Sequence, residues 1–282
     1  MITIAETLAA ARARLAGGDS PGLDAEILLC HLLQRPRSYL LAWPERELTV
    51  EQQAAYQTLL ARRAGGEPVA YITGEREFWS LSLRVTPAVL IPRADTELLV
   101  ELALARIPAG RPADIADLGT GSGAVALAIA SERPLARVVA VERSPAALAV
   151  ARDNAQRLGL DKVRCVEGDW CRPLAGQRFD LIVSNPPYIP DADPHLDLGD
   201  LPAEPRGALA AGDDGLDAIR RIVAQAPDHL RADGWLLLEH GYDQGEAVRT
   251  LLAGAGWQAV EGHPDLAGNP RCSTARRPKE GH

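Results

Sequence analysis

The tetrapeptide Asn185-Pro186-Pro187-Tyr188 follows a predicted strand at residues 180–183, and its residue types suit it to hold a planar amino group. Proline has a fixed φ and no N–H, and it keeps the preceding residue out of the helical region, so this segment is stiff and extended. The Asn185 side chain and the Pro186 backbone each offer a carbonyl acceptor. Together they could take both hydrogens of an NH₂ group, with Tyr188 against its flat face.

A planar NH₂ group is a poor nucleophile because its lone pair is delocalised. Fixing both of its hydrogens aims the nitrogen, and positioning of this kind is worth on the order of 7–11 kcal/mol in ideal cases. The acceptors also stabilise the positive charge that grows on nitrogen in the transition state. The motif therefore predicts chemistry at an amino group, whether that group belongs to a protein or to a nucleic acid.

A second motif is a glycine-rich loop that follows an earlier predicted strand, with Asp117 two residues before its first glycine. The loop consists of Gly119, Thr120, Gly121, Ser122 and Gly123. Glycines let the backbone approach a ligand closely and leave its N–H groups free. The spacing alone also admits a dinucleotide-binding interpretation, since Ala124 occupies the last place of a GxGxxG/A pattern.

The ends of the next two predicted strands carry further polar and aromatic residues. Glu142 ends the predicted strand at 138–142, where a carboxylate suits the two hydroxyls of a ribose. Asp169 and Trp170 follow the strand after it and offer an acceptor and a flat ring to an adenine. These three residues and the glycine loop predict a site for a nucleoside-containing cofactor.

The elements that must position these residues alternate along the chain. Strands are predicted within 113–123, 137–144, 162–170, 179–188 and 234–241, with helices at 124–134, 145–159 and 215–230. Such alternation predicts a mostly parallel sheet covered on both faces. Ligands of these sheets bind beyond the carboxyl ends of the strands, which is where both motifs fall.

The first part of the chain has a different pattern. Residues 1–75 are predicted to be entirely helical, with helices near 4–15, 24–33 and 50–64, two of which are closed by glycine pairs. This segment is either a small bundle without chemistry or a docking module for a macromolecular partner. Residues 77–91 alternate imperfectly and predict a hairpin or two short strands. We therefore predict domains at 1–75 and 93–282, joined by a hairpin linker at 76–92.

Composition narrows the class of protein. The 282 residues carry a formal net charge of −8, which argues against wrapping nucleic acid by bulk electrostatics. The four cysteines form no CxxC pair and have no histidine at metal-ligand spacing, so we expect reduced thiols and no metal. Charges interrupt the apolar N-terminal run, which is unlike a signal peptide, and no apolar stretch is long enough to span a membrane. We expect a cytoplasmic monomer.

The order of these motifs resembles class I S-adenosylmethionine-dependent methyltransferases. Within them, the chain resembles the bacterial release factor glutamine methyltransferases, also called peptide chain release factor N5-glutamine methyltransferases (the PrmC/HemK family), over nearly its whole length. The blocks that carry the resemblance are EFWSLSL at 77–83, LIPRADTELLVE at 90–101, DLGTGSGAVALAIA at 117–130, GDW at 168–170, VSNPPYIP at 183–190, EPRGALAAGDDGL at 204–216 and LLLEHG at 236–241. The first two blocks are not general to methyltransferases and discriminate most.

The resemblance implies an α/β fold with a seven-stranded, mostly parallel sheet, a small all-helical N-terminal domain and a joining β-hairpin. It implies transfer of a methyl group from S-adenosyl-L-methionine to the side-chain amide of the glutamine in the Gly-Gly-Gln motif of class I release factors. The glycine loop, Glu142, Asp169 and Trp170 would then hold the donor. Asn185 would contact donor and glutamine, residues 186–188 would complete the glutamine site, and Arg93 would help to shape the pocket.

Other functions stay open, and the sequence departs from the family pattern at several positions. Adenine, cytosine or guanine amino groups suit the Asn-Pro-Pro-Tyr chemistry equally well, so a nucleic-acid amino methyltransferase is the main alternative, and a non-enzymatic nucleotide-binding protein is the third. Ala94 stands where many relatives have proline, and Glu142 where aspartate is more common. The C-terminal sequence CSTARRPKEGH at 272–282 has little to bury, so we expect a short or frayed last strand with a poorly covered edge.

Overall fold

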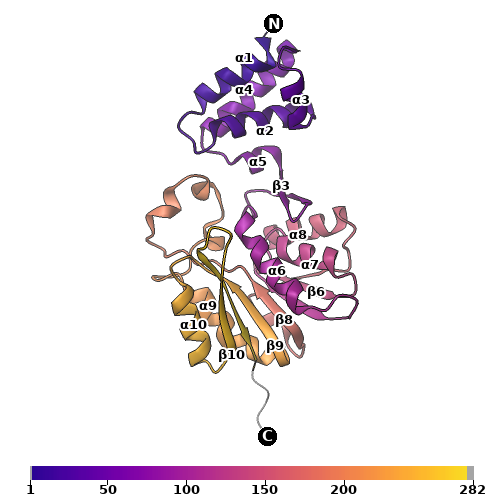
Figure 1. The fold of residues 1–282 in the computed structure, drawn as a ribbon, viewed down its shortest axis with the longest axis vertical. Helices are drawn as coiled ribbons and strands as arrows, with labels where there is room; N and C mark the ends of the chain where they lie inside the picture. Colours follow the sequence, from indigo (N-terminus) through magenta and orange to yellow (C-terminus); the bar gives the residue numbers. More distant parts are fainter. Residues whose placement is uncertain (1, 278–282) are drawn as a thin grey trace. The chain divides into compact units, whose positions relative to one another are not determined.

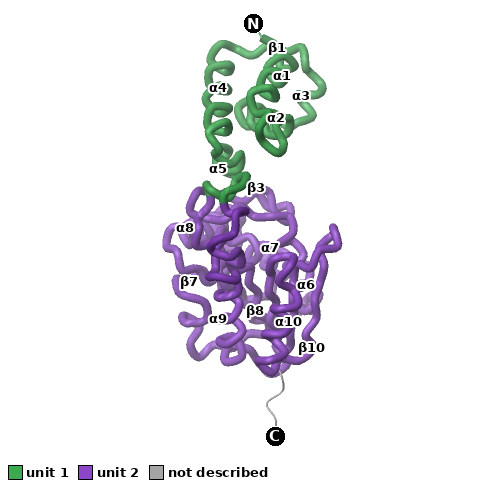
Figure 2. The backbone as a smooth tube through the Cα atoms, turned by 90° about the vertical axis from the view of Figure 1, so that its left-hand side faces the viewer, with its two compact units in different colours: residues 1–75, 197–203 green, residues 76–196, 204–282 purple. Residues whose placement is uncertain are grey.

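The computed structural model describes residues 2–277 and divides the chain into two compact units (Figure 2). The first unit comprises Met1–Glu75 and the short segment Asp197–Ala203. The second comprises Arg76–Leu196 and Glu204–His282. Within residues 2–277, no helix combines the length and the apolar character that crossing a bilayer requires.

The first unit is a helical bundle. Its helices are α1 (Ile4–Arg14), α2 (Pro21–Leu33), α3 (Arg37–Ala42), α4 (Val50–Ala64) and α5 (Val69–Thr73). Capping boxes at Thr3 and Thr49 start α1 and α4, because each threonine hydroxyl accepts from a backbone N–H three residues later. The expectation of an entirely helical segment needs one correction. Two-residue strands β1 (Ile2–Thr3) and β2 (Glu47–Leu48) pair antiparallel beside the helices.

A hairpin of β3 (Glu75–Phe78) and β4 (Leu81–Arg84) follows. Trp79 and Ser80 form its two-residue turn with φ values of 52° and 58°, the left-handed conformation that matches the twist of paired strands. Phe78 and Leu83 point into the core of the second unit. The hairpin was predicted to extend to residue 91, but residues 85–91 form no strand in the structure.

The second unit is built on a seven-stranded sheet with the order β10-β11-β9-β8-β5-β6-β7 (Figure 1). Its strands are β5 (Asp114–Leu118), β6 (Arg137–Glu142), β7 (Arg164–Glu167), β8 (Phe179–Ser184), β9 (Leu230–Glu239), β10 (Gln258–Pro264) and β11 (Pro270–Arg276). β5 to β9 run parallel, and β11 is antiparallel to both of its neighbours. The chain order reverses at β5, so a ligand site is expected beyond its carboxyl end.

Helices cover both faces of the sheet. α6 (Glu97–Arg106), α7 (Ala124–Glu132) and α8 (Pro145–Arg157) lie on one face, and α9 (Asp217–Gln225) and α10 (Gly245–Gly254) on the other. Short 3₁₀ turns occur at Ala94–Thr96, Arg172–Leu174, Pro194–Asp197, Leu201–Ala203, Arg206–Ala208 and Ala226–His229. Successive strand residues alternate between the two cores. Ile115 packs in the first core and Ala116 in the second, as the two-residue period of a strand requires.

The expectation of a frayed last strand is wrong for the described residues. β11 is inserted between β10 and β9, and residues 272–275 are fully buried. Two of their side chains carry hydroxyls, and both hydroxyls find partners. Ser273 Oγ lies 2.9 Å from His240 Nε2, and Thr274 Oγ1 accepts from Arg106 Nη2 at 3.0 Å. Residues 278–282 of the predicted stretch lie outside the described residues.

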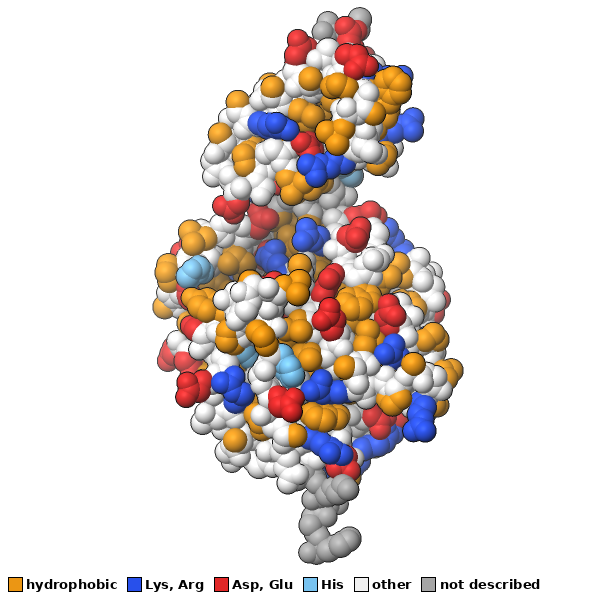
Figure 3. All heavy atoms as spheres, viewed as in Figure 1, with side chains coloured by type: hydrophobic (Ala, Val, Ile, Leu, Met, Phe, Trp, Pro, Cys, Tyr) orange, Lys and Arg blue, Asp and Glu red, His pale blue; other side chains and the backbone are white. Residues whose placement is uncertain are grey.

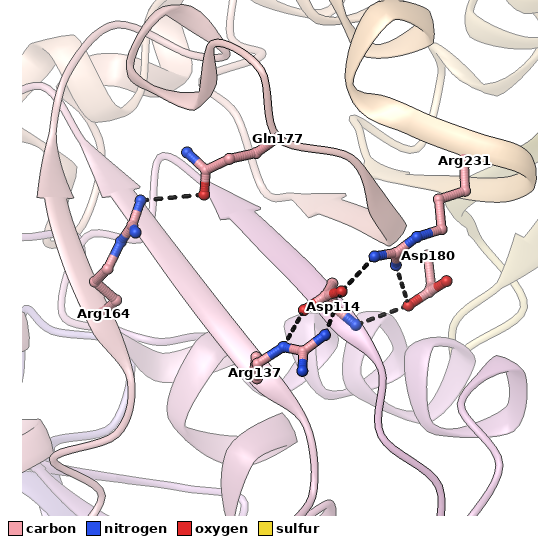
Figure 4. A network of polar contacts seen from close by, with 6 residues as sticks. All are labelled: Asp114, Arg137, Arg164, Gln177, Asp180 and Arg231. Carbon is pink, nitrogen blue, oxygen red and sulfur yellow. Dashed lines mark hydrogen bonds and ion pairs between the residues drawn. The ribbon is translucent and has the colours of Figure 1, made fainter.

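Ion pairs join the amino ends of four strands, at the end of the sheet away from the expected ligand site (Figure 4). Arg231 on β9 donates to Asp114 on β5 at 2.5 Å and to Asp180 on β8 at 2.6 Å. Arg137 on β6 also donates to Asp114, at 2.5 and 2.7 Å. The Asp114 backbone N–H completes the network by donating to Asp180 at 2.8 Å. These contacts hold the strand starts in register.

Candidate active site

A cavity of about 340 Å³ opens in the second unit at the carboxyl ends of the parallel strands. Its wall includes residues that follow four different strands of the sheet. From the predicted site it contains Gly119, Gly121, Glu142, Asp169, Trp170, Asn185 and Pro187. Residues 88–90, residues 205–212 except Arg206 and Leu209, and Asp217, Ala218 and Arg221 of α9 also line it. The sheet thus brings both sequence motifs to one cavity.

The glycine loop needs glycine at positions that face the cavity. Gly119 and Gly121 have φ values of 72° and 56°, a region that side chains disfavour. A Cβ at Gly119 would stand 3.3 Å from the Trp170 ring, and a Cβ at Gly121 would meet nothing within 4 Å. The open space at Gly121 is a cradle in which a ligand can approach the backbone.

The other three loop residues do not line the cavity. Thr120 Oγ1 donates to Asp117 Oδ2 at 2.6 Å, and the same oxygen accepts from the Ala126 N–H at 3.2 Å. The Ser122 carbonyl accepts from Asn154 Nδ2, and Gly123 is the N-cap of α7. Burial raises the pKa of the Asp117 carboxyl to about 7. These residues fix the shape of the loop.

Glu142 is held at the end of β6 by the loop itself. Its Oε2 accepts from the Gly121 N–H at 3.0 Å, and its Oε1 accepts from the Ser144 N–H at 2.9 Å. A carboxylate oxygen accepts more than one hydrogen bond, so both oxygens keep lone pairs for a ligand in the cavity. Two backbone bonds therefore orient this acid without exhausting it.

Asp169 and Trp170 form the adjoining wall. Trp170 has a φ of 51°, an uncommon conformation for a bulky residue, and its ring lies against Gly119. Asp169 makes a loose ion pair with Arg221 of α9, at 3.7 Å between the charged atoms. The strained Trp170 backbone is of the kind that clusters at ligand sites.

The Asn-Pro-Pro-Tyr segment is fixed from several sides. Asn185 Nδ2 donates to Thr96 Oγ1 at 3.1 Å, and the Tyr188 hydroxyl donates to Glu239 Oε1 at 3.3 Å. The Tyr188 N–H donates to the Leu209 carbonyl at 3.1 Å. Asn185 and Pro187 line the cavity, whereas Pro186 is buried and Tyr188 is absent from the cavity wall. Hydrogen bonds thus hold both Asn185 and Tyr188, on either side of the two prolines.

Arg93 does not line the cavity but joins two segments of its wall. It forms an ion pair with the buried carboxylate of Glu204, and Glu204 Oε2 also accepts from the Ile91 N–H at 3.0 Å. Glu204 thereby links residues 88–90 to residues 205–212. Sequence patterns did not point to Glu204 or Thr96, and they left the role of Glu239 open. Their blocks resembled the family, but no local pattern assigned them chemistry.

Two family models match the chain. The PrmC N-terminal domain model matches residues 6–74, and the methyltransferase small domain model matches residues 94–200. A solved methyltransferase from Pyrococcus furiosus superposes with a TM-score of 0.54 at 20% identity, covering 79% of this chain and 99% of that one, and it shows the fold alone. The open backbone at Gly121 and the acid at the end of β6 fit a nucleoside-containing donor. Fold and site together define a class I S-adenosylmethionine-dependent methyltransferase.

Relatives named release factor glutamine methyltransferase narrow the class. One from Pseudomonas aeruginosa is 56% identical over 257 residues, 90% of this chain and 93% of the relative. One from Vibrio cholerae is 53% identical over 275 residues, 96% of each chain. The chain belongs to the release factor glutamine methyltransferases. The fold class predicted from the sequence, including the helical N-terminal part and the seven-stranded sheet, is confirmed.

Proposed function

We propose that this chain methylates the side-chain amide nitrogen, N5, of the glutamine in the Gly-Gly-Gln motif of class I release factors. The observation that carries the proposal is the placement of Asn185. Asn185 lines the same cavity as Gly121 and Glu142, so a residue with an amide acceptor shares one space with the proposed nucleoside-binding wall. The names of the relatives supply the class of substrate.

On the donor side, Gly119 and Gly121 allow close approach of the methionine part, and Glu142 accepts from the ribose hydroxyls. Asp169 and Trp170 hold the adenine. Thr120, Ser122 and Gly123 contribute by keeping the loop in shape. When bound, S-adenosyl-L-methionine supplies an electrophilic methyl group on a sulfonium centre.

On the acceptor side, the Asn185 side-chain oxygen and the Pro186 carbonyl accept the two hydrogens of the glutamine NH₂. Holding both hydrogens aims the nitrogen and favours its partial pyramidalisation. The same two oxygens stabilise the positive charge that develops on nitrogen as its bond to the methyl carbon forms and the carbon–sulfur bond breaks, which releases S-adenosyl-L-homocysteine. The methylated nitrogen then loses one of its two protons to water, which restores a neutral amide. Pro187 keeps the segment extended, and Tyr188 anchors its end through Glu239.

We also propose a division of labour between domains at 1–75 and 93–282, with residues 76–92 as a linker. In this proposal the helical domain docks the release factor and the second domain carries catalysis. Most of the large apolar side chains that the described residues expose lie in the first unit. They are Ile2, Leu23, Ile27, Leu41, Trp43, Val50 and Leu198. A cavity walled by one unit of one chain is consistent with a monomeric enzyme.

Labelled donor tests the proposal directly. The enzyme is given methyl-labelled S-adenosylmethionine with purified release factor, ribosomal RNA or DNA in separate reactions, and mass spectrometry maps the label. We expect label on the Gly-Gly-Gln glutamine. Label on nucleic acid alone would establish the alternative, an amino methyltransferase of nucleic acid. The face in Figure 3 disfavours that alternative, because its Lys and Arg side chains are scattered among Asp and Glu rather than gathered in a tract.

The docking role is tested by Trp43→Ala, a change at a 52% exposed side chain of the first unit. We expect the KM for the release factor to rise while methylation of a short Gly-Gly-Gln peptide stays unchanged. Tyr242→Ala is the matched control, because Tyr242 is 61% exposed in the second unit. Equal KM values for all three proteins would remove Trp43 from the docking surface.

A further inference from the structure

A buried side chain of α8 joins the hairpin to the glycine loop. Asn154 is 0% exposed, and its amide bonds to three backbone groups. Its Oδ1 accepts from the Arg84 N–H at 2.7 Å, and its Nδ2 donates to the Arg84 carbonyl at 3.0 Å and to the Ser122 carbonyl at 2.9 Å. Arg84 and Ser122 lie 70 and 32 residues from Asn154 in the chain, so the amide joins segments that local structure does not connect.

The pairing with Arg84 decides which way the Asn154 amide points. The amide has one oxygen that accepts and two hydrogens that it can donate. The N–H and the carbonyl of Arg84 take the oxygen and one hydrogen, and a turned-over amide would set N–H against N–H and oxygen against oxygen there. The second hydrogen is thereby directed at the Ser122 carbonyl. The hairpin therefore sets the direction from which Asn154 holds the glycine loop.

The hairpin is itself fixed to the frame of the second unit. In its turn, the Trp79 N–H donates to Glu97 Oε1 of α6 at 2.9 Å, and Trp79 Nε1 donates to Glu132 Oε1 of α7 at 3.0 Å. Phe78 and Leu83, on its inner side, are buried in the first core. Hydrogen bonds to two helices and apolar packing thus make the hairpin an anchor from which Asn154 can hold another segment.

Both segments that Asn154 holds continue into the cavity wall. The segment that leaves the hairpin reaches the wall at residues 88–90, and the glycine loop reaches it at Gly121. The peptide unit that contains the Ser122 carbonyl also contains the Gly123 N–H, which donates to the Thr120 carbonyl at 2.8 Å. Holding this peptide unit on both sides fixes its plane, and with it the path of the loop beside Gly121.

We propose that Asn154 is a positioning residue for the methyl donor, because it fixes the glycine loop to the hairpin. The inference rests on the proposed donor site around Gly121 and Glu142 and does not depend on the identity of the methyl acceptor. Without the Asn154 amide, the Ser122 carbonyl loses its partner, and the loop can adopt conformations that do not receive the donor. An affinity falls in proportion to the fraction of the protein that is competent to bind. Donor affinity therefore depends on a residue outside the cavity wall.

The main test measures the Kd for S-adenosylmethionine by calorimetry in full-chain variants, with no release factor present. In Asn154→Ala the Kd should rise about 10-fold, the lower end of the effect known for partners that orient metal ligands. Asn154→Asp keeps the shape and the acceptor for Arg84 but removes both N–H donors, so its Kd should rise as well. At saturating donor, kcat for release factor should fall less than about threefold, because bound donor selects the competent loop.

Val248→Ala is the matched control for a loss of stability. Val248 is also 0% exposed, but it lies on α10, on the opposite face of the sheet. Its truncation should lower stability and leave the donor Kd within about twofold of wild type, since distant sites act independently. A wild-type Kd in Asn154→Ala, or an equal rise in Val248→Ala, would overturn the inference. If Glu142→Ala also binds the donor normally, the proposed donor site fails, and if wild-type enzyme does not methylate release factor, the proposed acceptor fails.

Hydrogen exchange in the wild-type enzyme tests the same link without a variant that has to fold. Coupling between two sites is reciprocal, so bound donor should slow exchange of the Arg84 amide about 10-fold more than that of the Asp114 amide. The Asp114 N–H also donates to a side-chain oxygen, but at the amino ends of the strands. Equal slowing at both amides would mean that the donor stabilises the whole unit and would overturn the role of Asn154.

Discussion

Acidic residues have opposite surroundings at the amino ends and at the carboxyl ends of the sheet strands, and β5 shows the contrast within four residues. Asp114 starts the strand and is paired with Arg137 and Arg231 in the network of Figure 4. Hydrogen bonding from Arg137 lowers the pKa of its carboxyl. Asp117 lies near the other end and is fully buried, and among residues 2–277 only Thr120 and a backbone N–H donate to it. Burial raises the pKa of its carboxyl to about 7.

The comparison distinguishes charges that stabilise the fold from charges that lie at the ligand site. At the amino ends of the strands, arginine forms ion pairs with Asp114 and Asp180 near the surface, where each such pair contributes little to stability. At the carboxyl ends of the strands, Asp117 and Glu239 are buried and accept few hydrogen bonds. Burial raises the pKa of the Glu239 carboxyl to about 7, as it does for Asp117. Buried carboxyls with shifted pKa values cluster at functional sites, which favours the carboxyl ends of the strands as the ligand-binding end of the sheet.

The largest effect is expected for Asn185→Ala at the carboxyl end of β8. It removes an acceptor that is used in the transition state, so kcat should fall about 100- to 1,000-fold, the range found when one oxyanion-hole donor is removed. Donor affinity, measured by calorimetry, should largely survive. Asp180→Asn at the amino end of the same strand is the matched control and should leave kcat unchanged. An Asn185→Ala enzyme within a few fold of wild type would contradict the role of this residue.

A smaller effect is expected for Glu142→Ala. The variant removes a charged acceptor from the donor wall, and hydrogen bonds to charged groups contribute roughly 1.5–3 kcal/mol. The Kd for S-adenosylmethionine should therefore rise about 10- to 100-fold. Glu167→Ala is the control, since Glu167 is the register partner of Glu142 on β7 yet is exposed and outside the cavity wall. Similar Kd values for both variants would exclude Glu142 from the donor site.

Residues at strand ends could be placed from the sequence because parallel strands converge at one edge. Gly121, Glu142 and Asn185 were brought together by that rule alone. The supporting contacts could not be predicted in the same way. Thr96 and Asn185 are 89 residues apart in the chain, and Arg93 and Glu204 are 111 apart. No periodic pattern relates such positions.

The last strand shows a second reason for failure. Residues 272–275 are small and partly polar, so by composition they indicate an exposed end. Insertion between two neighbours satisfies both edges of their backbone, and His240 and Arg106 reach the hydroxyls of Ser273 and Thr274. Tertiary partners thus override a weak local preference.

The pH dependence of stability should distinguish the two acids of β5. Because the folded state raises the pKa of Asp117 from 3.8 to about 7, it binds more protons than the unfolded chain across that window. Stability should therefore fall as the pH rises from about 4 to about 7, by up to about 1.4 kcal/mol per unit for one group. Asp117→Asn should flatten this fall in urea unfolding. Glu239 has a shift of the same sign and should preserve part of it.

Asp114 should behave with the opposite sign. Its lowered pKa means that its stabilising contribution is present above 3.8 and is lost as the pH falls through the folded value. The stability difference between Asp114→Asn and wild type should therefore shrink in acid and stay constant from pH 5 to 8. A constant difference down to the acid limit would show that Asp114 pairing does not stabilise the fold.

The smallest effect is expected for Arg231→Ala at the amino edge. The arginine side chain is 42% exposed, and its loss leaves Asp114 paired with Arg137, so the free energy of unfolding should fall by about 0.5–1 kcal/mol. Because the pair is exposed, 1 M salt should remove most of the difference. The kcat should not change, since Arg231 lies at the opposite ends of the strands from the cavity. A loss of stability that does not depend on salt, or a lower kcat with normal stability, would mean that the amino and carboxyl ends of the strands are energetically coupled.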